Sequence, residues 1–313
     1  MSLSLDRLRQ WQQQAGVVQP ERPSSTSTAT EISAPTTPEP CSLDAAFRLQ
    51  RVLAARLHDA RSRALPRHPS NTERLRIPPG EEIAPGLWLQ QDWLAQPWPS
   101  APISLAFAKR LEEIHDPRSL LFFDTETTGL NGGVGTRAFM IGTGDWSVDA
   151  YGRPGLRVRQ LTLGNPSAES AMLQTFASWL NPNTVLSSFN GRCYDVPLLK
   201  ARYRLARLRD PLSTLDHIDL LFPARRFWRG RWENCRLATL ERHLLGIVRE
   251  DDLPGSEAPR AWLSYLCGGD ARDLHRVARH NHQDVVSLAA LLVRLVSAQQ
   301  QTIESVARLL TQN

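Results

Sequence analysis

Cysteine is scarce in this chain of 313 residues, and its four cysteines lie far apart, at Cys41, Cys193, Cys235 and Cys267. No two of them form the C-x-x-C pair that is typical of a zinc ribbon. Their separation also argues against a disulfide framework and fits a reducing compartment. We therefore expect neither structural zinc nor disulfide cross-links.

Long apolar runs are also missing from the sequence. No stretch approaches the ~20 apolar residues that a membrane-spanning helix needs. Residues 1–10 have no apolar core of the kind found in a secretory signal. We therefore expect a soluble, cytoplasmic protein with no membrane partner.

The charge balance is basic but moderate. Lysine and arginine number 37 against 32 acidic residues, which gives a formal net charge of +5. This balance suits a polyanionic partner such as nucleic acid without requiring one.

The length of the chain is sufficient for one sizeable domain and a second small unit.

The amino-terminal third has a different character from the rest. Residues 1–15 predict a short amphipathic helix, and residues 20–40 are rich in proline, serine and threonine, as in a disordered linker. Apolar residues at helical spacing predict a further helix over residues 43–64. A short strand-like run follows at residues 83–89.

The most informative segment is residues 120–130, which read LLFFDTETTGL. An apolar run of this length that ends at a turn signal predicts a buried strand. Side chains alternate along a strand, so Asp124 and Glu126 share one face, where both can hold the same hard cation. The alternative is a surface turn with incidental acids, which we favour less because turns rarely follow so apolar a run.

A second acidic motif lies at residues 188–199, which read SFNGRCYDVPLL. A short apolar strand is expected before it, at residues 184–186, and a helix after it, over residues 198–208. Asp195 falls near the start of this helix. Taken alone, it could equally be a helix cap.

The third motif lies at residues 280–288, which read HNHQDVVSL, inside a helical pattern from about 271 to 296. His280 and Asp284 are four residues apart and therefore share one helix face. The alternative is a surface pair that only supports the helix.

In this order, the three motifs resemble those of the DEDD superfamily of 3′-5′ exonucleases, whose fold is that of ribonuclease H. The family's third motif has either tyrosine four residues before the aspartate or histidine five residues before it. This chain departs from both, with His280 at the tyrosine spacing and Arg279 five residues before the aspartate. Residues 236–246 and 251–255 also resemble the YprB-like branch of ribonuclease H-like proteins, and the resemblance covers about residues 119–296.

The resemblance implies an α/β, ribonuclease H-like mixed sheet, with antiparallel strands followed by parallel ones, flanked by helices. The residues agree, because 137–148 and 156–163 predict antiparallel strands and 167–180 a helix. A disordered linker and a helical amino-terminal region should precede this domain. The expected divisions are a mostly disordered segment, an accessory region with a helix and short strands, the exonuclease domain and a helical tail, at residues 1–41, 42–117, 118–298 and 299–313.

The resemblance further implies two Mg²⁺ or Mn²⁺ ions as cofactors. Asp124, Glu126 and Asp284 would hold the first ion, with Asp124 bridging to the second, which Asp195 would reach largely through water. Carboxylate and water ligands suit such hard cations. His280 would accept the proton of the attacking water, since its usual pKa suits that role at neutral pH.

Substrate contacts are also expected. By resemblance, Thr127 and Leu130 would contact the terminal nucleotide, and Asn190 would order the site or the bound strand. Residues 225–232 read RRFWRGRW, and this mixture of charges and aromatics suits a single strand, with Arg229 and Trp232 as contacts. A solvated face with buried tryptophans explains this stretch equally well.

The sequence thus predicts a metal-dependent 3′-5′ exonuclease that acts on the 3′ end of single-stranded DNA or RNA. One alternative is a structure-specific endonuclease. Another is a nucleic-acid-binding module with little or no nuclease activity. A scaffold that recruits a protein partner through the amino-terminal helices is compatible with either class.

Overall fold

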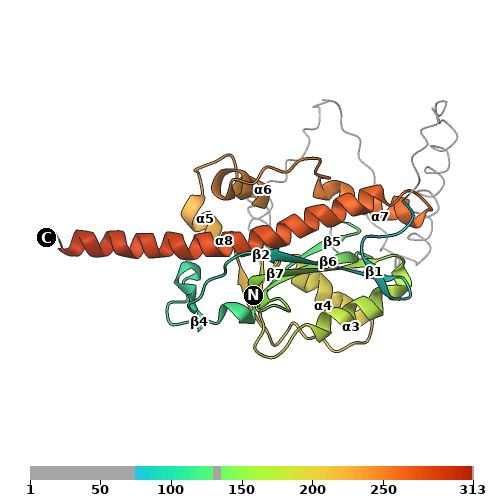
Figure 1. The fold of residues 1–313 in the computed structure, drawn as a ribbon, viewed down its shortest axis with the longest axis horizontal. Helices are drawn as coiled ribbons and strands as arrows, with labels where there is room; N and C mark the ends of the chain where they lie inside the picture. The colour runs from blue at the N-terminus through green and yellow to red at the C-terminus, as the bar shows by residue number, and fades with distance from the viewer. Residues whose placement is uncertain (1–74, 130–134, 312–313) are drawn as a thin grey trace, which may run out of the picture. The chain divides into compact units, whose positions relative to one another are not determined.

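The computed structural model describes residues 75–129 and 135–311 of the chain (Figure 1). These described residues belong to one compact unit of the chain. The helices and the linker expected before residue 75 lie outside the described residues, and so does Leu130.

A seven-stranded mixed sheet is the centre of this unit. Its order is β1-β2-β7-β6-β5-β8-β9, with antiparallel pairing from β1 to β5 and parallel pairing from β5 to β9. The strands are β1 (Glu81–Ala84), β2 (Leu87–Ala95), β5 (Leu120–Thr127), β6 (Ala138–Val148), β7 (Pro154–Leu163), β8 (Val185–Ser188) and β9 (Asp216–Asp219). A separate two-stranded sheet pairs β3 (Ile103–Ser104) with β4 (Ile114–His115).

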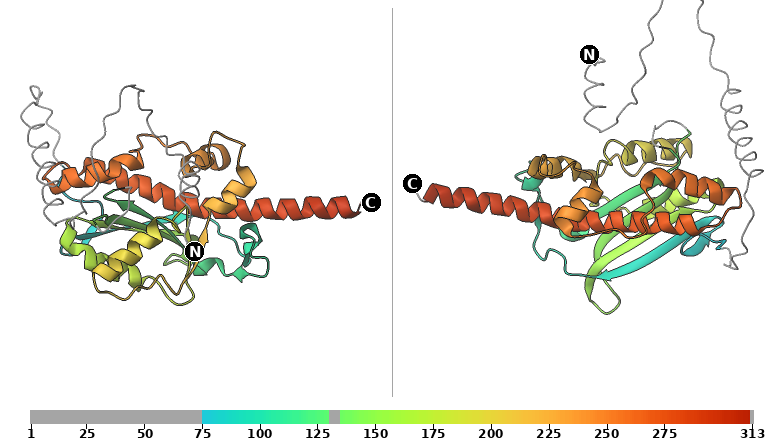
Figure 2. Two further views of the ribbon diagram at one scale, coloured as in Figure 1. Left: turned by 180° about the vertical axis from the view of Figure 1, so that it is seen from behind. Right: turned by 90° about the horizontal axis from the view of Figure 1, so that it is seen from above.

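Helices cover both faces of the sheet, as Figures 1 and 2 show. The α-helices are α3 (Glu169–Ser178), α4 (Asp195–Leu205), α5 (Leu221–Trp228), α6 (Leu237–Leu240), α7 (Ala258–Leu266) and α8 (Arg272–Thr311). The single-turn elements are η1 (Leu105–Ala108), η2 (Pro117–Ser119), η3 (Pro166–Ala168), the π-helical η4 (Glu241–Leu245) and η5 (Gly255–Glu257). None of the helices in the described ranges is long and apolar enough to cross a membrane.

Strand β5 runs through the middle of the core. Phe122 and Phe123 are fully buried, and they point to opposite faces because side chains alternate along a strand. The ring centroid of Phe123 lies 6.4 Å from that of Phe176 of α3. Phe122 belongs to the apolar cluster that includes Leu288 of α8. The continuous apolar run at the start of β5 is thus explained by burial on both faces.

Two glycines let α8 approach the sheet closely. A Cβ atom on Gly142 would lie 2.0 Å from Oδ1 of Asn281, and one on Gly144 would lie 2.7 Å from a methyl carbon of Val285. Gly142 pairs with Asp124 across β5 and β6, so the Asp124 side of β5 also faces α8. The face that carries the acidic residues is therefore covered by the helix of the third motif.

The structure agrees with the predicted elements from β5 to α4 and differs at three other places. The single strand-like run at residues 83–89 is a hairpin, in which β1 and β2 add two strands to the main sheet. Strand β9 was not expected. The last helix is continuous from Arg272 to Thr311, so the expected helical tail is the end of α8.

Candidate functional site

The carboxyl end of β5 brings the first two acids to the face of α8. Glu126 is buried and Asp124 is half-buried. The amide of Asn281 donates a hydrogen bond of 2.9 Å to Oδ2 of Asp124, and its oxygen accepts one of 2.9 Å from Gln160. Gln160 also donates to the backbone oxygen of Ala278, at 2.8 Å. This buried amide chain fixes Asp124 relative to the third motif.

Asp195 approaches from the opposite side of the same strand. It is the first residue of α4, and its Oδ1 accepts a hydrogen bond from the hydroxyl of Thr125, which lies between the two acids of β5. Gly191 leaves room for this arrangement, because a Cβ atom there would meet Oδ2 of Asp195 at 3.0 Å and Oγ of Ser188 at 2.4 Å. Asp195 therefore lies beside the β5 carboxylates.

The third motif completes the cluster. One ligand atom each from Glu126, His280 and Asp284 lies within 4.8 Å of the other two, which is close enough to hold one metal ion. Nε2 of His280 lies 3.4 Å from Oδ2 of Asp284, as the four-residue offset predicts. His282, two residues further on, instead pairs with Asp92 of β2 at 3.1 Å.

The electrostatics of this cluster favour a bound cation. Burial, and then the charges of Asp284, Asp195 and Glu126, raise the pKa of Asp124 well above its usual range. Burial and the neighbouring acids do the same to the pKa of Glu126. Burial also raises the pKa of Asp195 to about 6. The pKa of each group is raised because its charged form is poorly compensated, and a divalent cation would supply the missing compensation.

An arginine that the sequence did not single out contacts the third motif. Arg249 donates to Oδ1 of Asp284 and makes two bonds to Glu241, from Nη2 at 2.5 Å and from Nε at 2.7 Å. Glu241 is almost fully buried and also accepts a bond of 2.5 Å from the hydroxyl of Ser287. Burial raises the pKa of Asp284, with Arg249 and His280 acting against the shift.

A second residue not singled out is Asp219, at the end of the unexpected strand β9. Its Oδ1 accepts a backbone hydrogen bond of 2.7 Å from Asn190, and its Oδ2 accepts one of 3.1 Å from Arg192. Asn190 has a left-handed backbone, with φ of 68°. Asp219 thus fixes the turn that leads from β8 into α4 and places Asp195.

The expected substrate contacts are distributed more widely. The hydroxyl of Thr127 donates to the backbone oxygen of Gly129 at 3.0 Å, next to the acids. Arg229 is exposed just after α5, and the half-buried ring of Trp232 stacks on His243 with centroids 5.3 Å apart. Among the described residues, neither Arg229 nor Trp232 contacts any of the four carboxylates.

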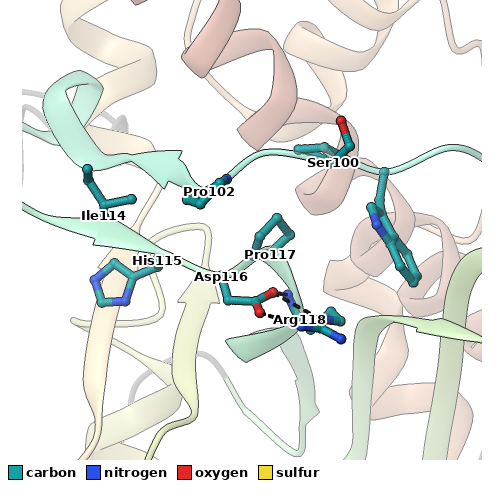
Figure 3. A pocket seen from close by; sticks show the side chains of 9 residues that line it. Ser100, Pro102, Ile114, His115, Asp116, Pro117 and Arg118 are labelled. Carbon is teal, nitrogen blue, oxygen red and sulfur yellow. Dashed lines mark hydrogen bonds and ion pairs between the residues drawn. The ribbon is translucent and has the colours of Figure 1, made fainter.

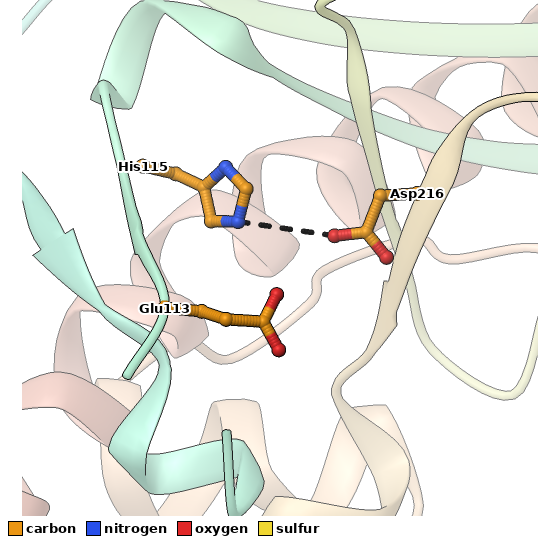
Figure 4. Close-up of side chains that lie close together, drawn as sticks. All are labelled: Glu113, His115 and Asp216. Carbon is orange, nitrogen blue, oxygen red and sulfur yellow. Dashed lines mark ion pairs between the residues drawn. The ribbon is translucent and has the colours of Figure 1, made fainter. Parts of the chain in front are cut away.

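A second group of ligand type has the opposite electrostatics. Glu113, His115 and Asp216 lie together at the far end of the parallel strands (Figure 4). Arg110 donates to both carboxylates, at 2.6 Å to Glu113 and 2.6 Å to Asp216. The Arg110 hydrogen bond lowers the pKa of Glu113, whereas the pKa of each acid in the first cluster is raised. The positive charge beside these two acids is already supplied by Arg110, so we interpret this group as an ion-paired structural cluster.

A pocket of about 510 Å³ opens beside that cluster (Figure 3). Its walls are Trp98, Pro99, Ser100, Pro102, Ile114, His115, Asp116, Pro117 and Arg118. The charges in this wall are paired with each other, because Arg118 donates to Asp116 at 2.8 Å. In the carboxylate cluster at the other end of β5, by contrast, burial raises the pKa of all four acids.

Comparison with known proteins agrees with this fold. A family model described as the RNase_H superfamily matches residues 121–296. The chain is also similar to the uncharacterised protein YprB of Bacillus subtilis (strain 168), with 37% identity over 182 residues. That match covers 58% of this chain and 43% of YprB, so the chain spans less than half the length of this relative.

Two solved structures show a distant similarity to this chain. An ExoI/SSB-Ct complex is 17% identical, with a TM-score of 0.32, and the match covers 51% of this chain and 43% of that one. The zinc-bound form of an E. coli ExoI–ssDNA complex is 16% identical, with a TM-score of 0.33 and coverage of 57% and 42%. At such scores the similarity supports neither a fold nor an activity.

Proposed function

The chain belongs to the RNase H superfamily, and from this membership we propose that it is a two-metal-ion-dependent 3′-5′ exonuclease. Its substrate would be single-stranded DNA or RNA, and its reaction the hydrolysis of phosphodiester bonds. The direction and the substrate follow from the likeness of the three acidic motifs to those of DEDD exonucleases. Asp124, Glu126, Asp195 and Asp284 are the proposed metal ligands.

The observation that carries this proposal is that carboxylates from three separate elements, β5, α4 and α8, lie close together, and burial raises the pKa of all four. The ion-paired Glu113, by contrast, has a lowered pKa beside Arg110. The pKa values of Asp124 and Glu126 are instead raised well above the usual range by burial and by the charges of nearby acids. Oxygen ligands in a charged, partly closed site match the preference of Mg²⁺ and Mn²⁺.

The chain's own groups would then divide the work. Asp124, Glu126 and Asp284 would hold one cation, and Asp124 and Asp195 would face the second. Bound cations would lower the pKa of the attacking water and stabilise the leaving 3′ oxygen. His280, whose Nε2 faces Asp284 at 3.4 Å, would accept the proton of the water. Thr127, Asn190, Arg229 and Trp232, with Leu130, are the proposed substrate contacts.

The test is nucleotide release from end-labelled single-stranded DNA and RNA with Mg²⁺ or Mn²⁺. We expect release from the 3′ end, loss of release in EDTA, and loss of release in Asp124→Ala and Asp284→Ala. The variants should stay folded, because removing one acid relieves repulsion among the rest. Asp116→Ala is a matched control, since Asp116 lies at the other end of β5 and pairs with Arg118.

Several results would contradict the proposal. Undiminished release in EDTA would exclude the metal mechanism. Cleavage inside the strand or only at structured ends would favour the endonuclease. Metal-dependent binding of the strand without hydrolysis would favour a binding module.

A further inference from the structure

The loop between η4 and η5 covers the imidazole of His280. Oδ1 of Asp252 lies 2.7 Å from Nδ1 of His280. A Cβ atom on Gly255 would lie 3.6 Å from Nε2, so the backbone of the same loop passes the other ring nitrogen. The surroundings of both ring nitrogens are therefore formed by this loop and by Asp284.

The loop is held on α8 from two sides. Asp251 pairs with Arg276 at 3.0 Å and with Arg279 at 3.4 Å, on the outer face of the helix. Leu253 is buried in the core. Asp252 stands between these two anchors, so its carboxylate is held toward His280.

The contact with Asp252 determines where the ring carries its proton. An ionised carboxylate has no hydrogen to donate, so a 2.7 Å contact requires a hydrogen on Nδ1 of His280. Nη1 of Arg249 lies 3.0 Å from the same nitrogen, and because a guanidinium only donates, that contact would need a lone pair on Nδ1 instead. The contact with Asp252 is the shorter of the two, and it joins a carboxylate that can only accept, so we assign the hydrogen to Nδ1; Nη1 then faces Oδ2 of Asp252 at 3.8 Å. Oδ1 and Oδ2 of Asp252 thus lie next to the ring of His280 and the guanidinium of Arg249, respectively. A neutral ring with hydrogen on Nδ1 presents a lone pair on Nε2, the nitrogen that faces Asp284.

We propose that Asp252 is a positioning residue, which fixes His280 in the tautomer with hydrogen on Nδ1 and so leaves Nε2 free to accept a proton. This inference rests on the proposed function in so far as the accepted proton is that of the attacking water. In this role Asp252 acts through the ring of His280, which it contacts at Nδ1. Orientation of a histidine by a carboxylate on its second nitrogen is a general device in catalytic and metal sites.

The tautomer can be observed without any activity. In the full chain labelled with ¹⁵N-histidine and free of metal, the Nδ1 resonance of His280 should have the shift of a protonated nitrogen and Nε2 that of an unprotonated one, at a pH where the ring is neutral. His280→Ala identifies the resonances among those of the eight histidines. Asp252→Ala should move the ring toward the Nε2–H form, which free imidazole side chains prefer, and Asp252→Asn should restore the original form in part, because its amide oxygen still accepts.

The kinetic consequence is a fall in kcat with little change in KM. For Asp252→Ala we expect a loss of about 10- to 100-fold in kcat, the range usual for partners of functional histidines. The same substitution in a His280→Ala background should cause no further loss, since the two residues act as a unit. Glu250→Ala is the matched control, because Glu250 is an exposed acid of the same loop and should change neither tautomer nor kcat.

The outcomes separate this inference from the proposed function. If Asp252→Ala leaves both the tautomer and kcat as they were, or if His280 carries its hydrogen on Nε2 in the parent protein, the inference is wrong. A parent protein without metal-dependent nucleotide release would overturn the proposed function, while the ¹⁵N spectra would still decide the role of Asp252.

Discussion

Individual carboxylates in this chain differ in how their charge is compensated. Glu113 and Asp216 share the guanidinium of Arg110, whereas Asp124, Glu126 and Asp195 face mainly one another and the protein interior. An isolated buried charge is costly unless a partner or a metal offsets it. The pairing with Arg110 therefore indicates a structural role for Glu113 and Asp216, whereas the cluster that contains Asp124 is the one proposed to bind metal.

His280 carries a sharp prediction at this scale. His280→Ala should lower the rate about 10²- to 10⁴-fold, as expected for the loss of acid–base catalysis, with metal binding nearly unchanged. Single-turnover rates and Mn²⁺ titrations would measure the two effects. His282→Ala is the control, because His282 pairs with Asp92 on the other side of the helix. Equal damage in both variants, or in neither, would show that His280 is not the base.

From the raised pKa of Asp195 we predict that the stability of the metal-free protein depends on pH. Burial raises its pKa from 3.8 to about 6 in the folded state. The folded state therefore binds this proton more tightly than the unfolded chain does, and stability falls as the pH rises from about 4 to about 6. Asp195→Asn cannot ionise, so it should be more stable than the parent at pH 7, by about 2–3 kcal/mol, and should lose most of that advantage near pH 4.

Urea unfolding in EDTA at both pH values would measure this difference. His217 acts in the opposite direction, because burial lowers its pKa to about 4, so that stability rises with pH between that value and its usual pKa. Since His217 is present in both proteins, the difference between variant and parent isolates Asp195. An advantage of equal size at pH 4 and pH 7 would contradict the assigned pKa.

Between elements, the close contact of α8 with β6 places the third motif over the first. Asn281 of α8 donates to Asp124 and fills the space that a side chain at position 142 would occupy. The contact joins the two halves of the site through the backbone of one helix and one strand. A small displacement of α8 should therefore separate Asp284 from Glu126.

Gly142→Ala tests this packing. The new Cβ atom would lie 2.0 Å from Oδ1 of Asn281, so the helix or the amide must move, which should cost about 1–3 kcal/mol of stability. Activity should fall further than that loss explains, because the bond to Asp124 is displaced. Thermal unfolding and nucleotide release are the measurements. Gly135→Ala is the control, since a Cβ atom there meets nothing within 4 Å; an active, stable Gly142→Ala would refute the argument.

At the scale of the whole molecule, the proposed contacts with a nucleic-acid strand extend beyond the acid cluster. Arg229 is exposed after α5, and Trp232 is half-buried against His243. The described contacts join neither of them to the carboxylates, so under the proposed function they would contact nucleotides upstream of the cleaved end. The basic net charge of +5 is compatible with such an extended contact.

The salt dependence of binding measures that path. Arg229→Ala should weaken binding of a long single strand and reduce the slope of log K against log salt by about one phosphate contact, roughly 0.7 for a single strand. A strand of two or three nucleotides should bind equally well to variant and parent. Arg118→Ala is the control, because Arg118 is an exposed arginine at the other end of β5. Equal slopes for Arg229→Ala and the parent would favour a solvated face.

Predictions that rest on local backbone periodicity agree with the structure. The alternation of a strand places Phe122 and Phe123 on opposite faces, and the helical offset of four residues places His280 beside Asp284. Strand β9 was not predicted because its sequence, DHID, lacks an apolar run: it has charged residues at both ends and a histidine inside. That histidine is buried against Ser188 at 2.8 Å, a contact that only the neighbouring strand provides.

The sequence by itself determined the acidic motifs, their order and the elements that carry them, because each depends on residues a few positions apart. The tertiary structure alone decided which groups surround them. Arg249 meets Asp284 across 35 positions, and Asp252 meets His280 across 28. Contacts over such separations leave no period in the sequence, because they form only when the loop after η4 folds back onto α8. The compensation of charge and the orientation of His280 are therefore properties of the fold.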